Sequence, residues 1–209
     1  MQSQERGPFL THISSLEAEC KKSGEASGLS LSKIFEIFGV DGHYILMLIF
    51  ILPFLQPVPM LGLSTPFGAL IGLLAIFAYF KKPPYLPNMW RQLNISTPTV
   101  LKITEGAEKV FAKIKFLIHP RMRFLFKEPF LAFNCIMLCW NSFLLALPIP
   151  FPFTNTLPAF AIFSLALAYL EEDGMFVIFS YILSVATVIY FATLAKAIEL
   201  SLRGLLGLI

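Results

Sequence analysis

The chain has 209 residues, of which 56% are hydrophobic and only 14% are charged, whereas a typical soluble domain carries about 25% charged residues. Its formal net charge of +3 does not by itself indicate a nucleic-acid partner, and its three cysteines cannot form a disulfide framework. The composition therefore excludes a disulfide-stapled domain and disfavours an ordinary soluble one.

The amino-terminal part of the chain is polar. Residues 1–28 mix acids with lysines and predict partial helix, and we expect no signal peptide, because no apolar core stands at the start. Leu29–Phe38 predicts a short amphipathic helix, capped by Ser30 or Ser32. Such a helix could lie on a membrane surface or pack against another part of the same chain, and the sequence favours neither. Its apolar face consists of Leu31, Ile34, Phe35 and Phe38.

Three long segments contain no Asp, Glu, Lys or Arg. They are Tyr44–Phe80, Pro129–Leu170 and Met175–Ala195. A helix needs about 20 apolar residues to cross a bilayer core, and each segment is at least that long. These lengths predict an all-α, polytopic membrane protein whose membrane domain covers residues 29–195, followed by a tail over 196–209.

The first two of these segments are broken by prolines, which remove a backbone donor and interrupt helices. Helix is predicted over 44–52 and 67–80 in the first segment, and over 130–147 and 159–170 in the second. The two helices of the first segment would each be about half as long as a 30 Å hydrocarbon core is thick. Each break is therefore expected near mid-membrane, as a re-entrant or a spanning element. The prolines at the breaks include Pro57, Pro59 and Pro66, and Pro148, Pro150 and Pro158.

The two breaks resemble each other at an offset of 91 positions, within repeats of about 44–80 and 129–170. Pro57-Val58-Pro59 matches Pro148-Ile149-Pro150, and Ser64-Thr65 falls opposite Asn155-Thr156. Paired helix breaks in corresponding positions indicate a binding site between repeats, predicted here as inverted repeats about a pseudo-two-fold axis. The candidate substrate-binding residues are Ser64, Thr65, Thr154, Asn155 and Thr156. A second role for the same hydroxyls is to cap the helices that follow, and the two roles are compatible.

The segment between the repeats is strongly basic. Residues 81–127 hold ten of the sixteen basic residues and only two acids, which places this loop in the cytoplasm. Lys196 and Arg203, beyond the last predicted helix at 175–195, suggest that its end is cytoplasmic as well. Anionic membrane lipids are the expected partner of the loop, rather than nucleic acid.

Acids at the ends of the apolar segments are candidate proton or ion sites. They are Asp41, Glu171, Glu172 and Asp173. Intramembrane acids often carry protons or ions, although acids at a helix end are more often simply solvated. Cys135 and Cys139 lie four residues apart, without a second Cys/His pair to complete a metal site. We therefore expect packing roles for them, and neither a metal nor a cofactor.

Several motifs, taken in order along the chain, resemble the ExoD family of bacterial membrane proteins, named for exopolysaccharide synthesis. The resemblance covers about residues 29–195. It rests on Pro57-Val58-Pro59, Gly62–Gly68, Tyr85-Leu86-Pro87, His119-Pro120-Arg121, Leu147–Pro150, Thr154–Ala159 and Leu170–Gly174. Tyr85 stands where the family usually has Trp, and Ala168-Tyr169 replaces a Gly-rich helix end. The resemblance implies a multi-pass protein of the bacterial inner membrane with a link to polysaccharide production, but no defined reaction.

Three functions are compatible with these features. The first is transport or flipping of an anionic or lipid-linked polysaccharide precursor at the two breaks. The second is an enzyme acting on a lipid-linked sugar, although the sequence lacks a phosphate-binding loop and a metal-ligand cluster. The third is a structural or regulatory membrane protein without substrate. A homo-oligomer is compatible with all three.

Overall fold

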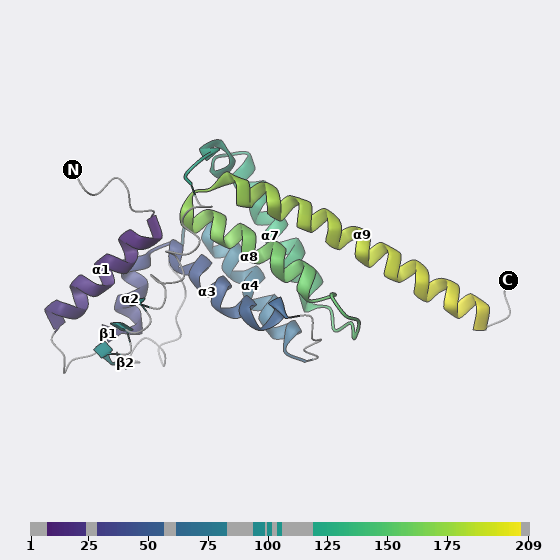
Figure 1. Cartoon of the computed structure of the whole chain (residues 1–209), viewed down its shortest axis with the longest axis horizontal. Coiled ribbons are helices and arrows are strands. Elements are labelled where there is room, and N and C mark those ends of the chain that lie inside the picture. Colours follow the sequence, from purple (N-terminus) through teal and green to yellow (C-terminus); the bar gives the residue numbers. More distant parts are fainter. Residues whose placement is uncertain are drawn as a thin grey trace.

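The chain folds into a helical bundle with a smaller helical layer at one end (Figure 1). The computed structural model describes residues 8–23, 29–56, 62–82, 94–98, 100–101, 104–105 and 119–205. The predicted all-α class is confirmed, with a two-residue strand pair as a minor addition. In chain order the elements are α1 (Pro8–Ser23), β1 (Leu29–Ser30), α2 (Leu31–Phe38), α3 (Asp41–Ile51), the 3-10 helix η1 (Leu52–Leu55), α4 (Ser64–Tyr79), β2 (Asn94–Ile95), the 3-10 helix η2 (Arg123–Phe126), α7 (Phe130–Ala146), α8 (Thr156–Glu171) and α9 (Gly174–Leu205).

Four helices form a ring in which each packs against two others. α3 contacts α4 and α8, and α7 contacts the same two helices from the other side. The contacts run antiparallel: Thr65 meets Ala146 while the Cys135 thiol lies 3.6 Å from the Ala75 carbonyl oxygen. Likewise, Tyr44 stacks on Tyr169 at one end of the α3–α8 pair. A large apolar core fills the ring.

Antiparallel neighbours place both helix connections at the same end of the ring. We call this end, where residues 56–64 and 147–155 join the helices, the proline end. The opposite end, where α3 and α7 begin and α8 meets α9, is called the acidic end. We call α3 with α4 the first hairpin and α7 with α8 the second. Because α3 and α7 run in the same direction, and so do α4 and α8, a two-fold axis that relates the two hairpins would lie parallel to the helices. The helix directions fit a parallel repeat and not the inverted repeat that the sequence predicted.

Buried positions follow the same offset of 91 residues through all four helices. On α4 and α8 the buried pairs include Gly68 with Ala159, Ile71 with Ile162 and Ala75 with Ala166, and Ser64 pairs with Asn155 just before α8. On α3 and α7 they include His43 with Asn134 and Met47 with Leu138, and Phe54 of η1 pairs with Leu145 of α7. Spacings of three and four residues put each set on one face of its helix. The two hairpins therefore present matching faces to the common core.

The helices, apart from α7, are longer than the sequence predicted. α4 and α8 have 16 residues each and α7 has 17, or roughly 24–26 Å at 1.5 Å per residue. The breaks consequently lie at one end of the bundle and not halfway along it. α9 has 32 residues and extends past the proline end (Figure 1). It is long and apolar enough to cross a membrane, whereas the ring helices are apolar but shorter.

The amino-terminal layer joins α1 and α2 to the acidic end (Figure 1). β1 pairs antiparallel with β2, and Cys20 of α1 is buried with Leu29 and Val100. Phe38 of α2 is 7% exposed. The predicted amphipathic helix thus packs against the rest of its own chain, the second of the two roles considered for it.

Candidate functional site

The described parts of the two proline motifs lie together at the proline end of the bundle. Pro66 and Pro158 each occupy the third position of α4 and α8, where a missing amide hydrogen costs no helical hydrogen bond. Pro148 and Pro150 lie in the connection between α7 and α8. Pro57 and Pro59 fall outside the described residues.

The threonine hydroxyls of the motifs do not cap their own helices. No side-chain cap is present at the start of α4 or α8. Instead, the Thr65 hydroxyl donates across the ring to the carbonyl oxygen of Ala146, at 2.8 Å. The Thr156 hydroxyl donates in return to the carbonyl oxygen of Gln56, at 2.9 Å. The expected capping role is wrong for these two residues, because each satisfies a carbonyl at the end of the opposite hairpin.

Thr154 has a local role. Its hydroxyl lies 2.7 Å from the Phe151 carbonyl oxygen and 3.0 Å from that of Ile149. These hydrogen bonds hold the α7–α8 connection in its folded shape. Tyr190 of α9 adds a hydrogen bond from its hydroxyl to the Pro152 carbonyl oxygen.

Two other motif side chains are buried without a partner. Ser64 is 1% exposed and Asn155 is 4% exposed. Neither Ser64 Oγ nor Asn155 Oδ1 has a hydrogen-bond partner among the described residues. They occupy corresponding positions at the starts of α4 and α8. A buried polar atom without a partner costs about 1–3 kcal/mol, so its presence calls for an explanation.

The proline end is closely packed and contains no charged side chain within residues 44–56, 62–80 and 129–170. A Cβ atom added at Gly68 would lie 2.7 Å from the Ser142 carbonyl oxygen and 2.9 Å from Ala146. The helix starts of α4 and α8 supply positive partial charge here. The arrangement can therefore offer backbone amides, a hydroxyl and an amide oxygen to a polar or anionic group, but no general acid or base.

The acidic end joins two motifs that are distant in sequence. Asp173 is fully buried, and its carboxylate accepts from Arg121 Nε at 2.8 Å and from the backbone amides of His119 and Met175. Burial alone would raise the pKa of Asp173, but the Arg121 guanidinium and the two amides outweigh it and hold the pKa below its ordinary value. Asp173 therefore fixes the entry into α9 and is not a free ion site.

The other candidate acids differ in their surroundings. Glu172 lies half-exposed in the left-handed conformation that ends α8, and it pairs with Arg123 at 3.1 Å. Glu171 is 2% exposed and has no ion pair in the described part of the chain. Asp41 pairs with His12 at 2.8 Å. Of the four acids, Glu171 alone is buried without an ion pair among the described residues.

Sequence reasoning missed a polar network around Asn134. Its side-chain amide donates to the Leu125 carbonyl oxygen and the Tyr169 hydroxyl, and its oxygen accepts from the Tyr181 hydroxyl. This network ties α7 to α8 and α9. The available signal was the presence of asparagine, at Asn134 and again at Asn141, within an apolar helix. No group of three or more His, Cys, Asp or Glu suitable for a metal occurs among the described residues.

Comparison with known proteins identifies the family. The model of the family described as "Exopolysaccharide synthesis, ExoD" matches residues 13–193. Protein ExoD of Rhizobium meliloti is 32% identical over 179 residues, which cover 85% of this chain and 75% of that protein. An uncharacterized protein of Synechocystis sp. is also 32% identical, over 80% of this chain and 81% of its own length. No solved structure matches. The chain is a member of the ExoD family, which is linked to exopolysaccharide synthesis.

Proposed function

We propose that this protein is a multi-pass protein of the bacterial inner membrane that binds an anionic or lipid-linked polysaccharide precursor at the proline end and moves it across the bilayer. The observation that carries the proposal is the pair of buried, unpartnered atoms, Ser64 Oγ and Asn155 Oδ1, at corresponding helix starts. The family's link to exopolysaccharide synthesis supplies the class of substrate.

The distribution of polar and apolar side chains supports the membrane location. Large apolar side chains cover the outer faces of the helices, while polar ones such as Asn134, Asn141 and Ser180 are buried. Exposed apolar surface combined with a polar interior is unusual for a soluble protein. The outward-facing apolar residues include Ile49, Leu73, Ile136, Phe143, Ile182 and Val185.

The reciprocal threonine bonds support a shared site. Thr65 and Thr156 each tie one hairpin to the other, so the two motifs form one structure at the proline end. The uncapped starts of α4 and α8 favour a negatively charged group such as a phosphate. The unpartnered Ser64 and Asn155 atoms suit the hydroxyl groups of a sugar, because both can accept hydrogen bonds. An anionic saccharide carries both kinds of group.

Substitutions within the two motifs separate a ligand role from a structural one. Ser64→Ala with Asn155→Ala removes the two oxygens that lack a hydrogen-bond partner among the described residues, so thermal stability should change little while substrate movement is lost. Thr65→Val with Thr156→Val removes two hydrogen bonds between hairpins, each worth about 0.6–1.7 kcal/mol in a membrane protein. This double variant should lower the melting temperature.

The test uses the purified full chain in liposomes that contain a lipid-linked oligosaccharide diphosphate, with both movement and chemical conversion measured. The proposal expects movement without conversion in the unsubstituted protein, and loss of movement in the Ser64/Asn155 variant. Conversion of the substrate would instead establish an enzyme. Unchanged movement in that variant would show that the site is not used.

A further inference from the structure

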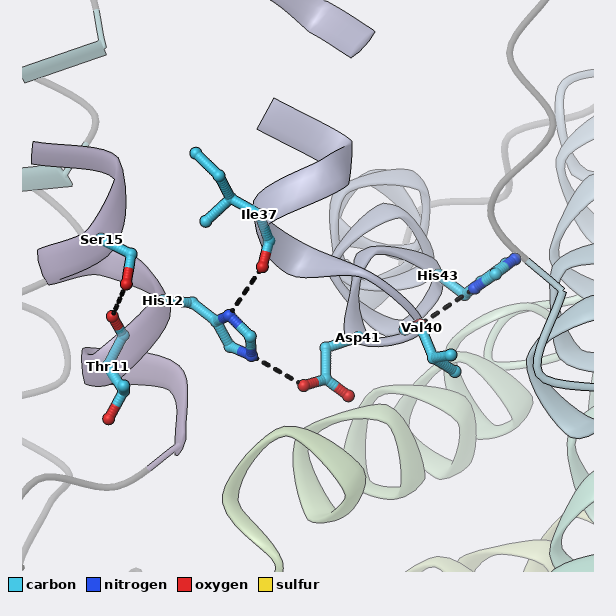
Figure 2. Close-up of polar contacts among 7 residues, drawn as sticks. All are labelled: Thr11, His12, Ser15, Ile37, Val40, Asp41 and His43. Atoms are coloured by element: carbon cyan, nitrogen blue, oxygen red, sulfur yellow. Dashed lines mark hydrogen bonds and ion pairs between the residues drawn. The ribbon is translucent and has the colours of Figure 1, made fainter. Parts of the chain in front are cut away.

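His12 connects the amino-terminal layer to the ring of helices (Figure 2). Its ring projects from α1 into the junction between α2 and α3. Nδ1 lies 3.1 Å from the Ile37 carbonyl oxygen, and Nε2 lies 2.8 Å from Asp41 Oδ2. One side chain therefore contacts the last turn of α2 and the first residue of α3 at once.

Both partners of the ring are acceptors. A carbonyl oxygen carries no proton, and Asp41 lies in the first turn of α3, where the helix dipole favours the ionised carboxylate. A neutral imidazole has one N–H and one lone pair, so it would direct that lone pair at one of the two oxygens. Only the doubly protonated ring donates to both. With an ionised Asp41, a doubly protonated His12 therefore satisfies both contacts.

Other charged side chains of α1 and α2 also interact, and Glu19 of α1 acts electrostatically on Lys33 of α2. Lys22 of α1 pairs with Glu19 on the same helix, and Lys33 of α2 pairs with Glu36. On α8, Tyr169 is occupied by Asn134, and Glu171 has no ion pair among the described residues. Of the titratable groups on α2, α3 and α8, Asp41 is the one that pairs with His12.

The apolar part of this docking is modest. α1 buries Ile13, Leu16 and Cys20, and the His12 ring lies 5.3 Å from the Phe38 ring. Because this apolar contact is small, the ion pair and the backbone hydrogen bond of His12 contribute a large share of the docking free energy of α1. The state of His12 can consequently decide whether α1 stays in place.

We propose that His12 is a proton-controlled latch that holds α1 against the acidic end of the bundle. With the ring charged, both hydrogen bonds form and α1 is docked. When the ring loses its second proton, the second donor is lost and α1 is released. The latch lies at the opposite end from the proposed substrate site and does not depend on it.

Cys20 provides a natural reporter of the latch, since it is buried in the docked layer at 1% exposure. The full chain, with Cys135→Ala and Cys139→Ala, would be labelled with a thiol reagent at several pH values. The same measurement on a His12→Gln variant gives a reference rate, and the ratio of the two rates removes the pH dependence of thiol chemistry itself.

We expect His12→Gln to label several-fold faster than its parent near pH 6, and the ratio to approach one near pH 8.5. Asp41→Asn should behave as His12→Gln does, and His119→Gln, which removes an exposed histidine, should behave as the parent. ¹⁵N chemical shifts of the His12 ring in the parent test the same point without relying on a variant. A ratio that does not change with pH, or a ring that carries a single N–H near pH 6, would overturn the latch.

Discussion

Two neighbouring acids at the end of α8 show how strongly burial changes the contribution of a carboxylate to stability. Asp173 is buried and receives hydrogen bonds from a guanidinium and two amides, whereas Glu172 is half-exposed and pairs with Arg123. The first arrangement fixes the backbone between two helices. The second is an ion pair of the exposed kind, which contributes about 0–1 kcal/mol.

Replacing each of these acids by its amide tests that difference. Asp173→Asn keeps the shape but removes the charge that Arg121 meets, and should lower the free energy of unfolding by about 2 kcal/mol, typical of hydrogen bonds to charged groups. Glu172→Gln is the matched control and should change it by less than about 0.5 kcal/mol. Thermal or denaturant unfolding in detergent measures both. Equal effects would show that Asp173 is not an anchor.

The same carboxylate predicts a dependence of stability on pH. The folded pKa of Asp173 lies below its unfolded value of about 3.9, so its contribution is complete above that value and is lost as the pH falls through the folded pKa. The melting temperatures of the parent and of Asp173→Asn should therefore differ at neutral pH and converge below about pH 4. A difference that persisted in acid would argue against the ion pair as its cause.

At the scale of the element, a glycine of α4 makes a close contact with α7. Gly68 faces α7 with no room for a Cβ atom, whereas a Cβ at Gly72, one turn later, would lie 3.5 Å from the Ser142 Cβ, an ordinary contact. Small residues at helix crossings allow backbones to approach closely, which matters most where water does not drive helix association.

Two alanine substitutions on α4 compare these sites. Gly68→Ala must push α4 away from α7 and should destabilise the protein by about 1–3 kcal/mol, as overpacking does. Gly72→Ala should be neutral or stabilising by up to about 1 kcal/mol, because alanine is the better helix former. Melting temperatures of the two variants decide the matter. A harmless Gly68→Ala would mean that α4 and α7 are less closely packed than described.

At the scale of the whole molecule, the direction of α9 changes the predicted topology. Gly174 donates a backbone hydrogen bond to Arg121, so α9 begins beside the end of the basic segment. It then runs past the proline end, which carries Lys196 and Arg203 to the opposite side of the bundle. The sequence predicted that the basic segment and the end of α9 both face the cytoplasm. If α9 crosses the membrane once, only one of them can.

The larger number of basic residues in 81–127 decides the orientation that we expect. Lys82→Cys should resist an impermeant maleimide in intact cells, and Glu199→Cys should be labelled, each in a background without native cysteines. Permeabilised cells serve as the control, in which both positions should react. Labelling of Lys82→Cys alone in intact cells would reverse the orientation, and equal labelling of both would contradict a single crossing by α9.

The sequence by itself determined the helical class, the family and the positions of the helix breaks. Apolar segments of this length are typical of helices, and prolines interrupt them except in the first turn. These properties depend on nearest neighbours along the chain, so they can be read from it directly. The same holds for the correspondence between Ser64-Thr65 and Asn155-Thr156, which is a property of the residue order alone.

Only the tertiary structure decided what those residues contact. Thr65 and Thr156 could cap their own helices or reach another element, and the packing of α4 against α7 and of α3 against α8 selected the second outcome. The parallel relation of the hairpins and the pairing of Arg121 with Asp173 likewise follow from helix directions in space. Contacts between residues far apart in sequence depend on how helices are packed, which local pattern does not encode.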